Sequence, residues 1–263
     1  MNQVVVSGVV YCCLGFLPLP LYIRIISLLF YRREYRKQQC YVLLGIIGTS
    51  DCILCFGMGL FGILVATGYG FGRFTEYVAI PILATAWQSM IALNVPLALN
   101  RLIILCNLHI SDKMVLLFVV LSCIYSSVYL VCHSVRFAPL TVYDNVFQYD
   151  AAVPFADFMK QFEFYSSLSI MGINFVIYVF IVGYLSFRKS QFSVQSRVIS
   201  KRERKLLVQT IVIFVCGAFV ETAYCKGEHF LPDSSWSTCF IIAFCIFTSG
   251  WVNPGLLLIC NRF

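Results

Sequence analysis

The chain has 263 residues, of which 60% are hydrophobic and only 12% are charged. A soluble domain carries about 45 to 50% apolar and about 25% charged residues, so this composition excludes an ordinary soluble protein. The formal net charge of +7 does not indicate a nucleic-acid partner, because such proteins present their basic residues on a soluble fold. The composition predicts a protein embedded in a lipid bilayer.

Seven apolar runs divide the chain. A hydrocarbon core of about 30 Å requires about 20 apolar residues per helix, and runs of this length and continuity are typical of helices rather than barrel strands. The sequence therefore predicts an all-α membrane protein, with one domain over residues 1–263 and seven transmembrane helices. These helices are predicted to cover approximately 4–30, 39–66, 77–105, 114–133, 164–187, 206–225 and 236–260.

The first run, 4–30, has an alternative interpretation as an uncleaved signal-like segment. It is longer than the apolar core of an ordinary signal peptide, and no basic residues precede it. We therefore interpret it as the first transmembrane helix. Most of the 13 cysteines lie inside such runs, where cysteine behaves as a small hydrophobic residue, so they do not indicate a disulfide-bonded scaffold.

The second run contains an acid beside a row of small residues. Spacings of three and four place the small residues on one helical face, where they let a neighbouring helix approach closely. They are Gly48, Cys52, Cys55, Gly59, Gly62 and Ala66. Asp51 flanks this face, so we expect its carboxylate to point into the bundle, for a functional contact or a hydrogen bond between helices.

Two short patterns in the same run resemble chemical motifs. Gly57, Gly59 and Gly62 have the spacing of a dinucleotide-binding turn but lack the preceding strand. Cys52 and Cys55 lack the second pair of ligands that a zinc site requires. No hydrolase, phosphate-loop or paired-histidine pattern occurs elsewhere. We therefore expect no enzyme activity, no metal and no cofactor.

The third run, 77–105, places Trp87, Asn94 and Arg101 on one helical face. At 1.5 Å per residue, Arg101 lies about 36 Å from Tyr77 along the helix, at the cytoplasmic edge of the membrane. Arg101 is therefore positioned to meet a cytoplasmic partner, and a plain topological anchor is the alternative. Pro96 removes a backbone donor, so we expect the helix to bend near this residue.

The segment 134–163 is the longest connection on the outer side, and it is acidic and rich in aromatic residues. Two interpretations stay open: a cap over an extracellular cavity, or a plain surface loop.

Polar residues also occur in the last two runs. Glu221 lies near the outer end of the sixth run, where it either meets a ligand or reaches the aqueous interface, and we favour the interface. In the seventh run, Asn253-Pro254 combines a polar side chain with a helix break, which predicts a deformable point. Because Asp51 and Asn253 would otherwise expose polar groups to apolar surroundings, we expect them to face each other.

Basic residues near helix ends stay on the cytoplasmic side of a membrane. The connections after the first, third and fifth runs hold the basic residues Arg32, Arg33, Arg36, Lys37, Lys113, Arg188, Lys189, Arg197, Lys201, Arg202, Arg204 and Lys205. The opposite connections hold only Arg73, Arg136, Lys160 and Lys226, together with most of the acids. The N-terminus is therefore predicted to lie outside the cell.

The order and depth of the polar residues resemble those of rhodopsin-like G-protein-coupled receptors. The resemblance rests on Asp51 in the second run, Asn100-Arg101 at the end of the third and Asn253-Pro254 in the seventh. The chain is more similar to the nematode serpentine chemoreceptors of class T or class X, in which a Leu-Asn-Arg ending replaces the acid-Arg pair.

This resemblance implies a seven-helix receptor in the plasma or sensory ciliary membrane that binds a small external chemical ligand and signals through a heterotrimeric G protein. The residues that it implicates in activation or coupling are Arg101, Asn100, Glu203, Asp51, Asn253 and Pro254. Glu203 is the nearest acidic candidate for an ion pair with Arg101. Trp87 and Glu221 are the candidates for ligand contact.

The sequence also departs from the rhodopsin-like pattern. Glu76 stands where those receptors have the helix-three cysteine, which argues against their outer disulfide, and Leu257 replaces the tyrosine expected after Asn253-Pro254. The sequence stops at Phe263, so a shortened, non-signalling receptor-like subunit is one alternative. A transporter or channel is another, although it would show related halves or broken helices at mid-membrane, which are not visible here.

Overall fold

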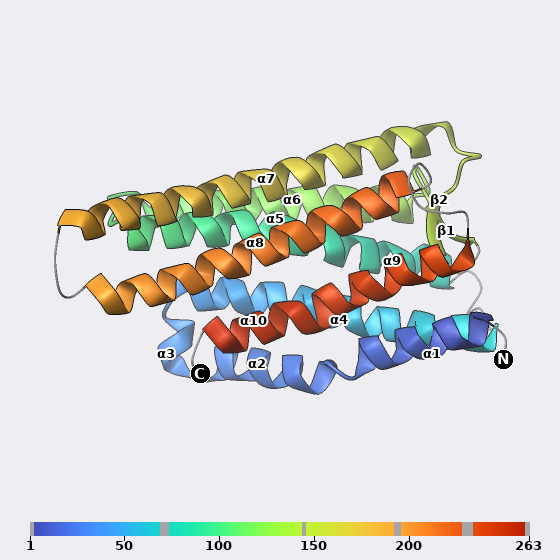
Figure 1. Ribbon diagram of the computed structural model, residues 1–263. Helices are drawn as coiled ribbons and strands as arrows, with labels where there is room; N and C mark the ends of the chain where they lie inside the picture. Colours follow the sequence, from blue (N-terminus) through green and yellow to red (C-terminus); the bar gives the residue numbers. More distant parts are fainter. Residues whose placement is uncertain (1–2, 69–73, 144–145, 192–195, 228–233, 261–263) are drawn as a thin grey trace.

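The computed structural model describes residues 3–68, 74–143, 146–191, 196–227 and 234–260. Within this part of the chain the helices group into seven columns that run side by side along one axis (Figure 1). Five stretches are long and apolar enough to cross a membrane, and a shorter apolar helix covers Cys239–Gly255. The predicted all-α bundle is therefore confirmed, and the chain is a multi-pass membrane protein.

The first column consists of two helices, α1 (Gln3–Phe16) and α2 (Leu19–Tyr31). The first transmembrane helix was predicted over 4–30, and Gln3–Tyr31 is indeed long and apolar enough for one membrane span, but the helix is broken between Phe16 and Leu19. Pro18 has no backbone N–H and Pro20 follows two residues later, so the regular ladder of backbone hydrogen bonds is interrupted there. A second helix, α2, therefore begins at Leu19.

The second column, α4 (Gln39–Thr67), follows the short helix α3 (Arg33–Arg36) and ends at Gly68, whose φ of 69° is left-handed. Its small-residue face packs directly against α1. A Cβ added to Gly8 would lie 2.5 Å from the backbone nitrogen of Ala66, and one added to Gly62 would lie 2.5 Å from that of Cys12. The close helix approach predicted for this face is confirmed, and its partner is α1.

The third and fourth columns are α5 (Ile80–Leu105) and α6 (Asp112–Ser134). A π-helical turn, η1 (Thr75–Ala79), leads into α5. Ser111 caps α6, because its side-chain oxygen accepts a hydrogen bond from the backbone nitrogen of Lys113.

The connection predicted over 134–163 is shorter and more ordered than expected. It holds an antiparallel hairpin of β1 (Leu140–Tyr143) and β2 (Val146–Tyr149), in which Leu140 pairs with Tyr149. The fifth column, α7 (Pro154–Gln191), then begins about ten residues before its predicted start at 164. The apolar run marks only the part of a helix that is uniformly apolar, so the mixed first turns of α7 were assigned to a loop.

The sixth column is α8 (Ser196–Lys226), whose first turns extend into the basic segment that the sequence analysis assigned to a loop. The seventh comprises α9 (Ser235–Phe247), a second π-helical turn η3 (Thr248–Val252) and α10 (Asn253–Cys260).

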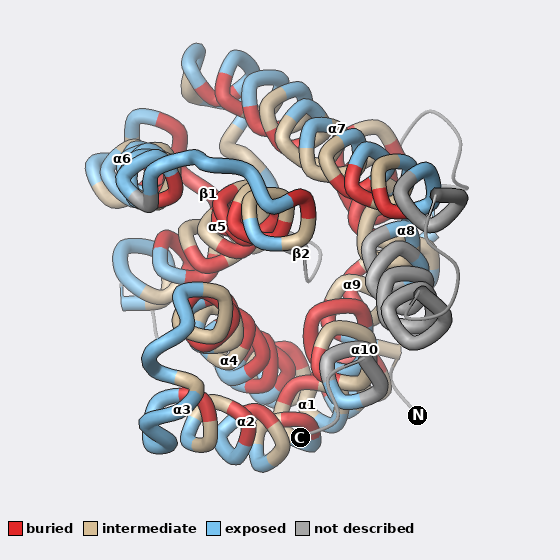
Figure 2. Tube along the Cα trace, turned by 90° about the vertical axis from the view of Figure 1, so that its left-hand side faces the viewer, coloured by how far each residue is buried: buried red, intermediate tan, exposed pale blue. Residues whose placement is uncertain are grey.

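The two ends of the bundle differ. The described N-terminal residues, β1 and β2 lie at one end, which we call the hairpin end (Figure 1). The basic helix α3, the last turns of α7 and the first turns of α8 lie at the other, which we call the α3 end. Figure 2 shows buried residues on the inner side of the ring of helices and exposed ones outside. Many of the outward residues are large and apolar, as lipid contact requires: they include Leu116, Ile124, Val176 and Phe180.

Candidate functional site

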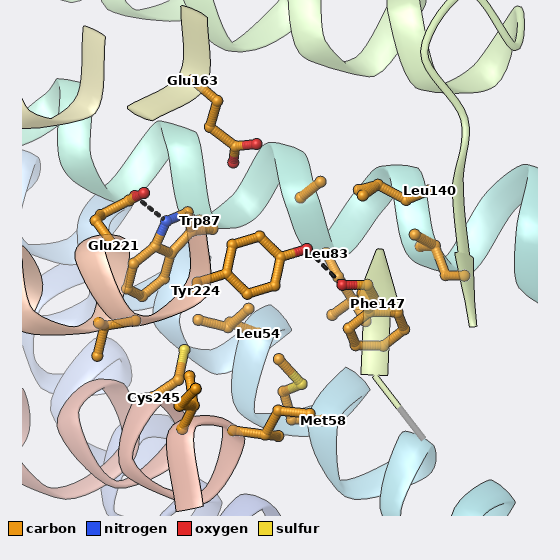
Figure 3. A pocket seen from close by; sticks show the side chains of 15 residues that line it. Leu54, Met58, Leu83, Trp87, Leu140, Phe147, Glu163, Glu221, Tyr224 and Cys245 are labelled. Atoms are coloured by element: carbon orange, nitrogen blue, oxygen red, sulfur yellow. Dashed lines mark hydrogen bonds between the residues drawn. The ribbon is translucent and has the colours of Figure 1, made fainter. Parts of the chain in front are cut away.

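A cavity of about 100 Å³ lies inside the hairpin end of the bundle, beneath β1 and β2 (Figure 3). Five helices and both strands contribute to its wall. The lining residues include Leu54 and Met58 of α4, Leu83 and Trp87 of α5, Glu163 of α7, Glu221 and Tyr224 of α8, Ile242 and Cys245 of α9, and Leu140 and Phe147 of the hairpin. An occupant of this cavity would therefore contact most of the bundle at once.

The hairpin is held over the cavity by α8. The hydroxyl of Tyr224 donates a 2.6 Å hydrogen bond to the backbone carbonyl of Phe147, and the Phe147 ring lies 4.2 Å from the ring of Phe61 in α4. The cap over a cavity, one of the two interpretations of segment 134–163, is therefore what the structure shows.

Glu221 lies on the wall of this cavity with only 2% of its surface exposed. The indole N–H of Trp87 donates a 2.8 Å hydrogen bond to its Oε1. The sequence analysis favoured the aqueous interface for Glu221, and that preference was wrong. The Glu221 side chain points toward α5 and not toward the end of its own helix. Trp87 and Glu221, the two candidates for ligand contact, therefore lie together on the cavity wall.

Glu163 is a second carboxylate on the same wall, and the sequence analysis missed it. Nε2 of Gln88 donates a 2.7 Å hydrogen bond to its Oε1, and the hydroxyl of Tyr149 donates to its Oε2. Burial, followed by the negative charge of Glu163, raises the pKa of Tyr149 well above its ordinary value, so this hydroxyl keeps its proton. Had the first turns of α7 been recognised as helical, Glu163 would have been a candidate.

A polar cluster lies deeper in the bundle, around Asp51. The amide Nδ2 of Asn253 lies 3.4 Å from Oδ2 of Asp51, which confirms the predicted contact between them. The hydroxyl of Tyr22, which has one hydrogen to donate, lies within hydrogen-bond distance of two acceptors: the same oxygen, at 3.1 Å, and the backbone carbonyl of Ser249. This cluster joins α2, α4 and the seventh column, and Tyr22 is a member that the sequence analysis did not find.

The π-helical turn η3 explains why the backbone carbonyl of Ser249 is available to accept a hydrogen bond from a side chain. In a regular α-helix the backbone N–H of Asn253 would bond this carbonyl, four residues earlier. Here it bonds the carbonyl of Thr248 instead. The following residue, Pro254, has no N–H, so the chain tolerates the irregular turn beside it. The helix is thus irregular directly before Asn253-Pro254, and the deformability expected there stays a prediction.

A second cavity of about 70 Å³ extends from the polar cluster to Arg101. Asp51, Asn253 and Pro254 line one side of it, and Arg101 with Tyr178 lines the other. An amino group of Arg101 (Nη1) donates a 2.7 Å hydrogen bond to the hydroxyl of Tyr178 in α7. The guanidinium carbon lies 5.8 Å from the centre of the Tyr178 ring.

Arg101 is 8% exposed, so it lies inside the bundle rather than on its surface. Its neighbour Asn100 is also buried and donates a 3.1 Å hydrogen bond to Oε1 of Gln39, at the start of α4. Glu203 lies in α8, but its side chain is outside the described residues, so its pairing with Arg101 stays a prediction. Tyr178 is the partner of Arg101 that the sequence analysis missed.

The twelve cysteines that the structure describes are all free. The structure also describes no group of three or more acidic, histidine or cysteine side chains arranged to hold a metal ion. The site therefore has two parts that the described side chains form: an apolar cavity lined by the carboxylates of Glu163 and Glu221, and a polar cluster around the carboxylate of Asp51.

Comparison with protein families identifies a family to which the chain is similar. The family described as "Serpentine type 7TM GPCR chemoreceptor Srt" matches residues 1–248 of the chain. The matched region contains the whole cavity under the hairpin together with Asp51 and Arg101, and it ends at the first residue of η3. No curated protein matches the chain.

Proposed function

Because the chain belongs to the Srt family of serpentine seven-helix chemoreceptors, we propose that it binds a small external chemical ligand and activates a heterotrimeric G protein. The ligand binds in the cavity under the hairpin, and the G protein binds at the α3 end. This family is one of receptors rather than enzymes, so the cavity serves recognition and not catalysis.

The observation that carries this proposal is the composition of the cavity wall. One small occupant contacts α4, α5, α7, α8 and α9 together, and several of these helices continue to the α3 end. A ligand shifts a conformational equilibrium only if it binds the two states with different affinity. A cavity shared by five helices meets this condition, because any relative movement of the helices changes its shape.

The third column connects the two ends. From Trp87 at the cavity to Arg101 is 14 residues of continuous helix, or about 21 Å along α5. The polar cluster around Asp51 and the second cavity lie beside this stretch. Movement of α5 relative to α7 would break the bond from Arg101 to Tyr178 and present the guanidinium to a partner at the α3 end.

The basic residues indicate which end of the bundle faces the cytoplasm. Arg33 and Arg36 of α3 lie at the α3 end (Figure 1), and basic segments stay on the cytoplasmic side of a membrane. The hairpin end and the N-terminus therefore face outward in this proposal, in the plasma membrane or the membrane of a sensory cilium.

The proposal is tested by expressing the full chain in cultured cells with a promiscuous G protein and a broad panel of odorants. Ligand-dependent activation that is lost in Arg101→Ala, at equal surface expression, is the expected result. A chain that reaches the surface and responds to no odorant under any G protein would instead fit a non-signalling subunit. Ligand-dependent transport or current without G-protein activation would fit a transporter or channel.

A further inference from the structure

Two carboxylates face the cavity under the hairpin, and the rest of its lining is mostly apolar. Glu163 comes from α7 and Glu221 from α8, and their exposed fractions are 7% and 2%. Figure 3 shows Glu221 bonded to Trp87, with the carboxylate of Glu163 directed toward the same cavity.

The described residues that line this cavity include no basic side chain. Lys160 and Lys226 lie on the same two helices but are not part of the lining, and the ammonium of Lys226 lies 5.9 Å from the ring centre of Phe164. A salt bridge that the structure does describe joins Arg136 to Glu76, both of which are solvent-exposed. The negative charge available to the cavity therefore has no matching positive charge on its wall.

The hydrogen-bond donors around the two acids stabilise the charged form. An indole N–H and an amide N–H can only donate, and they reach Glu221 and Glu163 over 2.8 Å and 2.7 Å. Bonds donated to a carboxylate favour its ionised state and fix the direction in which its oxygens point. Burying an ionised carboxylate in apolar surroundings is unfavourable unless a cation accompanies it.

The cavity volume limits the size of that cation. A cavity of about 100 Å³ is smaller than the roughly 150 Å³ apolar cavity that binds benzene in an engineered protein. In proportion to benzene, a molecule of about four carbon or nitrogen atoms fits such a space. Leu83, Ile242 and Met58 contact its apolar part, and the carboxylates contact its charged end.

We propose that the cavity recognises a small apolar organic amine in its protonated form, with its ammonium group bound by Glu163 and Glu221 and its hydrocarbon part against α4, α5 and α9. This inference rests on the proposed function, because it names the chemical class of the ligand that the receptor detects.

The test compares three probes with one three-carbon skeleton: propylamine, 1-propanol and propionate. The full chain is purified in detergent, and its melting temperature is measured with a thiol-reactive dye in the presence of each probe. At about a hundredfold excess over Kd, the amine is expected to raise the melting temperature by roughly 5 °C or more. The alcohol and the carboxylate are expected to leave it unchanged.

Glu163→Gln and Glu221→Gln are each expected to remove the amine-dependent shift. Glu76→Gln is the matched control, because Glu76 is exposed and does not line the cavity. If a glutamine variant does not fold, the comparison of the three probes on the natural chain still decides the matter. Equal shifts with amine and alcohol, a larger shift with the carboxylate, or no shift with the amine would each overturn the inference.

A G-protein assay on the same protein separates this inference from the proposed function. An amine-specific shift without G-protein activation would support the ligand class and contradict signalling. Activation by other odorants without any amine-specific shift would support signalling and overturn the ligand class.

Discussion

The indole nitrogen of Trp87 lies 2.8 Å from Oε1 of Glu221, and this bond joins α5 to α8 across the cavity under the hairpin. Both residues were candidates from the sequence, but nothing in the sequence paired them. The bond fixes one carboxylate of the cavity and connects the third column of the bundle to the sixth.

Trp87→Phe should weaken this connection. The variant retains a ring but leaves Glu221 without the indole donor, and a typical hydrogen bond contributes about 0.5 to 1.5 kcal/mol. We expect a lower melting temperature for the detergent-solubilised protein. Trp236→Phe is the control, because Trp236 is 57% exposed. Identical melting of both variants would show that the bond contributes nothing to the fold.

Gly8→Ala should destabilise the protein strongly. The new methyl group would lie 2.5 Å from the backbone of Ala66, and backbone cannot move aside without separating α1 from α4. Overpacking of this kind costs about 1 to 3 kcal/mol. Gly172→Ala, where the structure shows no described atom within 4 Å, is the control and should be neutral or slightly stabilising. The yield of folded protein and its melting temperature measure both effects.

Asp51→Asn should alter signalling more than folding. The amide oxygen can still accept a hydrogen bond from Tyr22, but the substitution removes the ionisable carboxyl group that Asn253 contacts. We expect ligand-dependent G-protein activation to fall at least several-fold at nearly unchanged surface expression. The double variant that exchanges the two side chains, Asp51→Asn together with Asn253→Asp, tests the contact itself.

If the exchange restores part of the response, the acid and the amide act as a pair. A response that stays as low as in Asp51→Asn alone would show that the acid is required on α4 in particular.

Arg101→Ala should abolish G-protein activation and leave surface expression intact, because in the proposed mechanism movement of α5 presents the Arg101 guanidinium to a partner at the α3 end. Arg136→Ala, at the hairpin end, is the control for losing an arginine and should signal normally. Normal signalling by correctly trafficked Arg101→Ala would show that this residue is only a topological anchor.

Tyr178→Phe should raise basal activity. The substitution removes the hydroxyl that accepts the 2.7 Å bond from Arg101 and leaves the ring in place. Loss of about 1 kcal/mol of restraint shifts a two-state equilibrium about fivefold. Glu203→Ala is expected to raise basal activity modestly as well, because Glu203 is the acidic residue proposed to pair with Arg101. Unchanged basal activity in Tyr178→Phe would argue that Arg101 is not restrained by α7.

The orientation of the bundle predicts which epitope tags antibodies reach on intact cells. A tag at Met1 should be accessible, and a tag at Gln195, between the fifth and sixth columns, should be accessible only after permeabilisation. The reverse pattern would invert the topology and exclude an outward-facing cavity.

Hydropathy and helical spacing predicted the features that depend on one helix at a time. The seven columns, the close-packing face of α4 and the inward direction of Asp51 follow from apolar length and from spacings of three and four. Even the contact between Asp51 and Asn253 was predictable, because each is a polar group in an apolar run with few available partners.

Features that depend on the register between helices could not be predicted in this way. Tyr22 and Tyr178 become partners of Asp51 and Arg101 only when α2 and α7 are placed beside them. Glu163 was missed because α7 begins with mixed turns covered by the hairpin, and hydropathy reports lipid contact, not helix content. The break at Pro18 was readable from the sequence, but the apolar run around it is uninterrupted.

The direction in which the Asn253 side chain points depends on the π-helical turn η3, because this turn shifts the helix after it by one residue relative to a regular α-helix. An α-helix advances 3.6 residues per turn, so each residue corresponds to about 100° of rotation about the axis. If this turn tightened to regular α-helix, everything after it would rotate by about that angle relative to α9. Asn253 would leave Asp51, and the carbonyl of Ser249 would return to the helix and release Tyr22. Such a tightening would change the contacts of the seventh column in one discrete step of helical phase rather than through a continuous range of bends.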